Sequence, residues 1–535
     1  MWRILPRSKP SLRERTAERA IADFHARLAP PAPPSGAPDL LGEDIARLNV
    51  PHALAIGTLD DGRVLALPRD TVCKHAAIGG SSGNGKSRQT AQLIFQIIDA
   101  DADGSGPLTE VECCDCKGET TDFIKAGLGA RLLKAPPRVR AWIKENVWVA
   151  GWQRDRVTPM PLFDNRDGHI SHAYLAHLRT QTTVDASSYS FTDGTRHEFA
   201  MYAQLSATLG FPPNVAVLTA LYTDPAFRSR LLRDVPDPQL RTHYDTVEVT
   251  VPKGTIQALR RRVEYLLSFD VIRASIGPPP VSLERLDIRR DGIVRLVDVS
   301  TRFALPPSMA AERASHRIID VLRSAPRRDR RRPAVLVVEE AAKLLATCPE
   351  LAEPLATGVQ TLRYHNVGVW FVAQDFSLLP SHILEPVLLN SFWLAMFQTR
   401  RDAQCLATQV VAGAEDAKAE SQARKAFERD IENLPRQTCY VWPRGHRVFR
   451  LRAMDCPDPA ADGRTIDELV ALFDSEVSAK SMISVATADR LIAEWEAEVL
   501  GRREIPPPEA PSGCRNTFSM ADLLRDLSDE EGSDA

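Results

Sequence analysis

Residues 80–87 combine the residue types that bind a polyphosphate. They read Gly80-Ser81-Ser82-Gly83-Asn84-Gly85-Lys86-Ser87 and match the pattern G-x-x-x-x-G-K-[ST]. The glycines let the backbone wrap the phosphates, and successive N–H groups form an anion nest at a helix N-terminus. We expect Lys86 to reach the β- and γ-phosphates and Ser87 to hold Mg²⁺, so ATP and Mg²⁺ are the predicted ligands. Arg88 directly follows and completes the predicted nucleotide-binding segment.

The alternative to a phosphate loop is a chance glycine-rich turn. A true loop needs a strand before it and a helix after it. An apolar stretch, 72–78, precedes this one, and 89–98 continues with the apolar spacing of a helix. The context therefore favours the phosphate loop.

A second acidic site is required for hydrolysis, and Glu339-Glu340 supplies it. The pair ends an apolar stretch, 334–338, that reads as a buried strand. Ligands of α/β sheets bind at this carboxyl edge. We expect Glu339 to hold Mg²⁺ and Glu340 to act as general base on the attacking water. The alternative is a strand that ends in ordinary solvated glutamates.

Gln374 is a lone polar residue at the end of the apolar run 367–373. A glutamine in this position can hydrogen-bond the γ-phosphate or the attacking water, and so report that the nucleotide is present. The alternative is a glutamine that caps the following helix.

The elements that must position these residues alternate between strands and helices. Buried strands separated by helices indicate a parallel sheet covered on both faces. The predicted fold class is therefore α/β: a RecA-like P-loop ATPase core with a mostly parallel sheet, plus a helical insertion domain. Hairpins are expected near 53–67 and 439–451, the second of them extending the sheet edge.

The sequence predicts seven segments along the chain. In order they are a basic amphipathic helix (1–29), a Pro-rich linker (30–48), the first part of the core (49–134), a mostly helical insertion (135–285), the second part of the core (286–458), C-terminal helices (459–504), and a Pro-rich linker with an acidic tail (505–535).

Composition places the chain among globular proteins. It has 535 residues, 44% hydrophobic and 26% charged, with a formal net charge of −3. The nine cysteines follow no regular framework, which favours a reducing compartment, and the cluster near Cys114 is read as buried thiols rather than a zinc site. No apolar run is long enough to span a membrane, so we expect a cytoplasmic protein with no transmembrane segment.

Three blocks resemble the HerA/FtsK superfamily of DNA-pumping ATPases, and most closely the TraD/TraG-like type IV coupling proteins of conjugation. They are the phosphate-loop block with its preceding histidine (75–87), the Asp-Cys-Lys-Gly-Glu at 115–119, and the turn Arg363-Tyr-His-Asn-Val-Gly-Val. The resemblance implies a homo-oligomeric ring, usually a hexamer, that hydrolyses ATP while moving DNA. It makes Arg363 the candidate finger that reaches a neighbouring subunit's γ-phosphate, with Arg400 and Arg401 as rivals. The alternative for Arg363 is a surface arginine that ends a helix.

The chain departs from those families in three ways. It has no N-terminal pair of membrane helices, which puts docking in a secretion channel in doubt. Its acid pair is Glu-Glu, where coupling proteins commonly have Asp-Glu. Its insertion is too dissimilar to be matched residue by residue.

DNA contact in such a ring is made largely with the phosphate backbone. The best local candidates are Lys253, Arg260, Arg261 and Arg262, although a solvated helix face explains them equally well. The acidic C-terminal tail could bind a protein partner or only aid solubility.

The function that best fits these features is an ATP-dependent translocase, or ring motor, acting in DNA transfer or processing. We expect its DNA to be double-stranded. Two alternatives stay open. One is a nucleotide-gated recruitment platform for a DNA-transfer or secretion complex, and the other is a HerA-like motor paired with a nuclease in end processing or phage defence.

Overall fold

The described part of the chain is residues 40–502 of a computed structural model, apart from 107, 154, 161–192, 287, 289–291, 300–306, 411–416, 455, 457 and 462. The predicted basic helix 1–29 and the acidic tail 505–535 lie outside it. The chain divides into two units. Unit 1 is drawn from Met1–Cys113, Asp122–Ile143 and Asp329–Leu469, and unit 2 from Cys114–Thr121, Lys144–Arg328 and Val470–Ala535.

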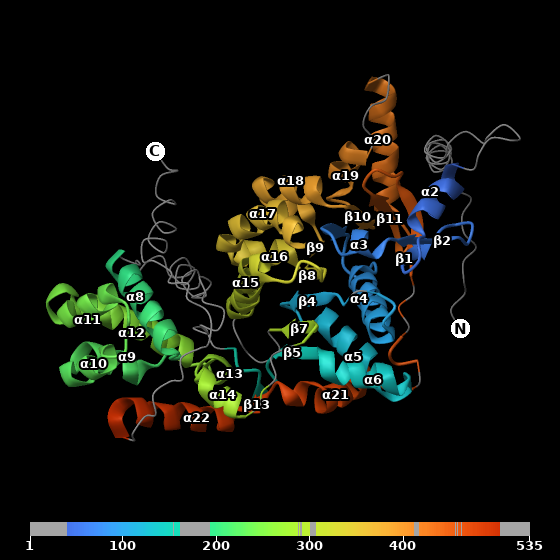
Figure 1. The fold of residues 1–535 in the computed structure, drawn as a ribbon. Helices are drawn as coiled ribbons and strands as arrows, with labels where there is room; N and C mark the ends of the chain where they lie inside the picture. Colours follow the sequence, from blue (N-terminus) through green and yellow to red (C-terminus); the bar gives the residue numbers. More distant parts are fainter. Residues whose placement is uncertain are drawn as a thin grey trace, which may run out of the picture. The chain divides into compact units, whose positions relative to one another are not determined.

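A large sheet forms the centre of unit 1. Its strands that lie or begin in unit 1 follow one another in the order β2-β1-β12-β11-β10-β3-β9-β8-β4. Most of them are labelled in Figure 1. The strands β10, β3, β9 and β8 pair in parallel, and β11 joins β10 antiparallel. The bounds are β1 Leu54–Thr58, β2 Val64–Leu67, β3 Ala76–Gly79, β4 Glu110–Asp115, β8 Ala334–Glu339, β9 Val367–Ala373, β10 Trp393–Phe397, β11 Thr438–Pro443 and β12 Phe449–Ala453.

The parallel strands are apolar along their whole length because they are buried on both faces. Every residue of β3, β8, β9 and β10 is buried, as expected for strands covered by crossover helices. The helices of this unit are α2 Leu40–Leu48, α3 Arg69–Val72, α4 Lys86–Asp103, α5 Glu119–Lys134, α6 Pro137–Asn146, α16 Ala341–Thr347, α17 Ala352–Thr361, α18 Ser381–Asn390, α19 Ala403–Val410 and α20 Ala417–Glu432, with 3₁₀ turns η4 Pro349–Leu351, η5 Leu362–His365 and η6 Phe376–Leu378. The predicted α/β class with a mostly parallel sheet is confirmed.

Both predicted hairpins are present at the antiparallel side of this sheet. β1 pairs with β2, and β11 pairs with β12. One prediction was wrong: the linker expected over 30–48 includes helix α2 instead of continuing as coil to residue 48. Ile45 and Leu48 lie three residues apart and are both buried, so an apolar helix face stabilises the segment.

Unit 2 contains a group of short helices and four strands among its described residues. β5 and β7 pair in parallel, and β6 pairs with β13 antiparallel. The insertion was expected to be mostly helical, and it also contains β5 and β6, which the sequence did not predict. The bounds are β5 Val147–Gly151, β6 Arg156–Val157, α8 Asp193–Leu209, α9 Val215–Thr223, α10 Pro225–Leu232, α11 Pro238–Thr250, α12 Lys253–Leu267, α13 Asp270–Ile276, α14 Pro280–Arg285, β7 Val294–Asp298, α15 Pro307–Ser324, η3 Ala325–Arg327, α21 Ile466–Glu476, η7 Ser478–Lys480, β13 Ile483–Ser484, α22 Val485–Ala497 and a terminal turn, η8, Glu498–Arg502.

Within the described residues, no helix has both the length and the apolar character that crossing a bilayer requires.

Candidate nucleotide-binding site

The glycine-rich loop connects β3 to α4, as the sequence predicts. Gly80, Gly83 and Gly85 all have positive φ, of 137°, 80° and 118°. Such values are readily adopted only by glycine, so the loop's shape depends on the residue type at these positions. Gly85 is also the N-cap residue of α4, so the loop leads directly into the helix N-terminus. Backbone N–H groups at a helix N-terminus are suited to binding anions.

Residues next to two other strands, β10 and β11, make hydrogen bonds to the backbone of the loop. The N–H of Ser81 donates to the carbonyl of Gln398 at 2.7 Å, just after β10. Arg436 donates from Nε to the carbonyl of Gly83 at 2.9 Å, and the N–H of Gln437 donates to the carbonyl of Asn84 at 3.0 Å. These supports were not predicted, because no local pattern marks a residue that lies over 300 positions away.

Lys86 lies within the curve of the loop. Its ammonium donates to the carbonyl oxygens of Gly80 and Ser81, and only 7% of the residue is exposed. A buried ammonium held by carbonyl dipoles is positioned to meet an anion that the loop N–H groups would also bind. Ser87 and Arg88 follow on the first turn of α4 and are half-buried.

The acid pair lies at the same edge of the sheet as the loop. β8 pairs with β9 so that Glu339 is level with Val372, and β9 pairs with β3 so that Ala373 is level with Gly79. Only β9 separates the two strands, which places β8 about 10 Å from β3. Glu339 is 3% exposed. The carboxyl ends of these strands therefore bring Glu339, Gln374 and the glycine-rich loop to one edge.

Glu340 and Gln374 are in direct contact. The side-chain amide of Gln374 donates to Oε1 of Glu340 at 2.7 Å. Glu340 has φ of 54°, a conformation that is uncommon for a residue other than glycine. Strained backbone of this kind clusters at functional sites, where the fold fixes the direction of a side chain. The carboxylate of Glu340 is therefore oriented in two ways, by the hydrogen bond from Gln374 and by the left-handed backbone conformation of Glu340 itself.

A small acidic network supports the turn after Gln374. Asp402 accepts hydrogen bonds from the N–H groups of Phe376 and Ser377 at 2.7 and 2.9 Å. Burial raises the pKa of Asp402 to about 6, with the neighbouring carboxylate of Asp375 adding to the shift. Arg401 donates to Asp375 at 2.9 Å while its own side chain stays 71% exposed. Arg401 and the exposed Arg400 follow β10, at the loop edge of the sheet.

Arg363 lies at the opposite end of the parallel strands from the glycine-rich loop, where β9 begins. It is in the turn η5 before β9, is exposed, and has its guanidinium 4.7 Å from the ring centroid of Phe392. Nearby His75 precedes β3, and its Nδ1 accepts from the N–H of Val369 at 3.0 Å. Burial, reinforced by the positive charge of Arg363, lowers the pKa of His75 to about 4. Arg363 is thus not grouped with Lys86 in its own chain, and its role as a finger stays a prediction.

The Asp-Cys-Lys-Gly-Glu block begins at the last residue of β4. The carboxylate of Asp115 accepts from the N–H groups of Lys117, Thr120 and Thr121 at 2.9, 2.9 and 3.0 Å. Burial raises the pKa of Asp115, and the negative charge of Asp298 adds to this effect. Asp115 therefore shapes the tight turn into α5.

The basic residues proposed to contact DNA lie on α12 of unit 2. Lys253, Arg260 and Arg261 are exposed, and the apolar face behind them is buried through Leu259, Val263 and Leu266. Arg260 donates to Glu264 at 2.7 Å, which partly offsets its charge. Arg262 is half-buried, and burial lowers its pKa. DNA contact by this face stays a prediction.

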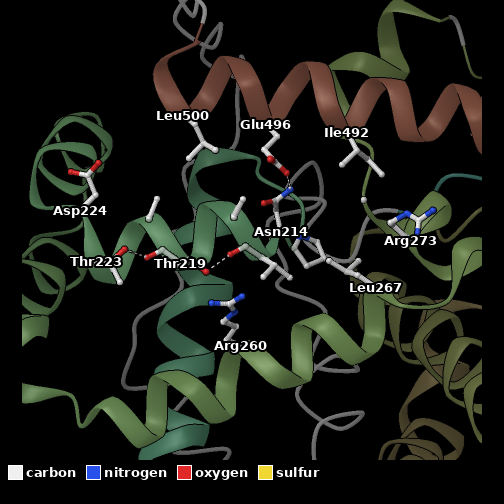
Figure 2. Close-up of a pocket in the computed structure, with 15 residues that line it drawn as sticks. Asn214, Thr219, Thr223, Asp224, Arg260, Leu267, Arg273, Ile492, Glu496 and Leu500 are labelled. Atoms are coloured by element: carbon white, nitrogen blue, oxygen red, sulfur yellow. Dashed lines mark hydrogen bonds between the residues drawn. The ribbon is translucent and has the colours of Figure 1, made fainter.

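Arg260 also lines a cavity of about 700 Å³ within unit 2 (Figure 2). The cavity lies among α9, α12 and α22, and apolar and polar side chains both line it. Asn214 donates to Glu496 at 3.1 Å across it, joining α9's N-cap to α22. This cavity lies in the insertion and C-terminal helices and includes none of the predicted nucleotide-binding residues.

No protein family model and no curated protein matches the chain. Among solved structures it is similar to the bacterial conjugative coupling protein TrwBdeltaN70 in its unbound form, at 15% identity and a TM-score of 0.46, covering 79% of this chain and 94% of that one. It is also similar to VirB4 of Thermoanaerobacter pseudethanolicus, at 15% identity and a TM-score of 0.48, with 77% and 98% covered. TrwB in complex with ADP and Mg²⁺ aligns at 15% identity and a TM-score of 0.43, with 77% and 92% covered. At these values the likeness alone assigns neither family nor activity.

Proposed function

We propose that this protein is an ATP hydrolase that moves DNA as a homo-oligomeric ring, in DNA transfer or processing. One observation carries the proposal. The glycine-rich loop with Lys86 and the Glu340–Gln374 pair converge at the carboxyl edge of one parallel sheet. An edge of this kind is where α/β proteins bind nucleotides and do chemistry on them.

Each residue has a defined task in this proposal. The loop N–H groups and Lys86 bind the phosphates of ATP. Ser87 and Glu339 would hold Mg²⁺ through the oxygen ligands that this ion prefers, and the ion would supply charge neutralisation at the phosphates. Glu340 accepts a proton from the attacking water, and Gln374, which donates to Glu340, orients that carboxylate.

The ring is proposed from the position of Arg363. An arginine at the sheet edge opposite its own loop cannot assist its own site, but it is free to reach the site of a neighbouring copy. Arg401 is the rival, because it lies at the loop edge and is exposed. DNA would then be held by basic side chains such as Lys253, Arg260, Arg261 and Arg262, largely through the phosphate backbone.

The test compares ATP hydrolysis with and without duplex DNA, together with the mass of the assembled particle. We expect DNA to accelerate hydrolysis, Lys86→Ala to abolish it, and the particle to contain several copies of the chain. Lys343→Ala is the matched control, since this lysine is exposed on the helix that follows the acid pair. Hydrolysis that DNA leaves unchanged would contradict the motor and favour a nucleotide-gated recruitment platform. Hydrolysis that survives Lys86→Ala would contradict the site itself.

A further inference from the structure

Three potential metal ligands meet in the helical part of unit 2, apart from the nucleotide site. His197 and Glu198 lie on α8, and His243 lies on α11. Their ligand atoms all lie within 4.8 Å of one another. Within the described residues, this is the one cluster of three or more histidine, cysteine, aspartate or glutamate side chains with such spacing.

The carboxylate of Glu198 is the most buried member of the cluster. The side chain of Glu198 is 5% exposed, and burying an ionised carboxylate is costly unless it is paired. Its Oε2 accepts from the hydroxyl of Tyr222 at 2.8 Å and lies 3.1 Å from Nε2 of His243.

An ion pair between Glu198 and His243 does not explain why the imidazole of His197 lies beside them. This imidazole is half-buried and makes no hydrogen bond to any residue that the structure describes. Its ring lies edge-on to that of His243, with the centroids 5.5 Å apart. Two imidazoles this close to each other and to one carboxylate form a set that a cation would complete.

The spacing and donor chemistry suit zinc. Two ligand atoms bound at 2.0–2.1 Å to a tetrahedral ion lie about 3.3 Å apart, close to the 3.1 Å between His243 and Glu198. The ligand atom of His197 lies within 4.8 Å of the other two and would have to move closer to bind the same ion. Two histidines and a carboxylate are a known zinc ligand type, and three protein ligands leave a fourth position for water. Tyr222 would orient the ligating carboxylate, as hydrogen-bond partners of metal ligands commonly do.

We propose that His197, Glu198 and His243 form a zinc-binding site that fastens α8 to α11. The site is independent of the proposed nucleotide chemistry, because all three ligands and Tyr222 lie in the helical insertion. Metal binding would stabilise this group of helices by acting on the folded state only.

The experiment uses the full chain without a polyhistidine tag, treated with chelator and then dialysed against Zn²⁺. We expect one Zn²⁺ per chain, a visible absorption band of tetrahedral type when Co²⁺ replaces it, and a higher thermal midpoint with metal. His197→Ala should weaken Zn²⁺ binding at least about 100-fold, and Tyr222→Phe about 10–100-fold as a positioning residue.

Two further variants keep the result decisive. Glu198→Gln retains an acceptor for Tyr222 but removes the charge, so it should fold and lose most of the metal affinity. His382→Ala replaces an exposed histidine on α18 and should bind Zn²⁺ like the unaltered chain. A chain that takes up no Zn²⁺, or a His197→Ala variant that binds it unchanged, would overturn the proposal and leave Glu198–His243 as an ion pair.

Discussion

Replacing Gly80 by alanine tests whether the shape of the loop backbone, and not only its lysine, is needed to bind nucleotide. Gly80 has φ of 137°, where a side chain costs about 1–3 kcal/mol. A Cβ there would also lie 2.7 Å from Cβ of Phe397 and 3.1 Å from its Cα and carbonyl carbon. Because these atoms belong to the backbone region of β10, they cannot rotate away, and the loop itself must shift.

Gly83→Ala is the matched control for the steric part. Gly83 also has positive φ, of 80°, but nothing lies within 4 Å of an added Cβ. It should cost only the conformational strain, about 1–2 kcal/mol, which corresponds to an affinity for ATP lower by about 5–30-fold. For Gly80→Ala, with strain and steric overlap together, we expect a loss of at least about 100-fold.

The assay is a fluorescence titration with an ATP analogue, accompanied by thermal melts of each variant. The melts show whether the substitution distorts only the loop, which would leave the thermal midpoint unchanged, or destabilises the whole sheet, which would lower it. If Gly80→Ala binds the nucleotide as tightly as Gly83→Ala, the reasoning from the loop's contact with Phe397 is refuted.

The remaining predictions concern the groups around this loop. Glu340→Gln should lower kcat by about 10²–10⁴-fold while ATP still binds; equal losses of binding and turnover would argue against a general base. Gln374→Ala removes a hydrogen bond to a charged group and should lower the kcat of ATP hydrolysis by about 10–100-fold, measured as release of phosphate. Arg363→Ala should lower kcat by about 10³–10⁵-fold if it serves as the finger, whereas a loss confined to Arg401→Ala would transfer that role. His75 has a pKa of about 4 in the folded chain against 6.5 for the ordinary side chain, so the unfolded state binds the proton first as pH falls. Stability should therefore fall between pH 6.5 and 4, by up to about 3 kcal/mol; His75→Asn, which keeps an acceptor for the N–H of Val369, should flatten this part of a denaturant-measured pH profile.

Local patterns were sufficient to predict the parts of the site that depend on residue type and short spacing. The glycines, Lys86 and the apolar strand before them act over a few residues, and the structure places them as expected between β3 and α4. The acid pair and Gln374 could also be predicted, because each ends a wholly buried parallel strand. Strands of that kind align their carboxyl ends, so residues at the ends share one edge.

Tertiary structure alone decided which distant groups support these residues. Nothing near Gly83 in the chain indicates that Arg436 donates to its carbonyl, or that Phe397 leaves no room beside Gly80. The meeting of His197, Glu198 and His243 is equally invisible in the sequence, where two adjacent residues stand 45 positions from the third. Such contacts depend on strand order and helix packing, which join segments far apart in the chain and leave no periodic signal in either one.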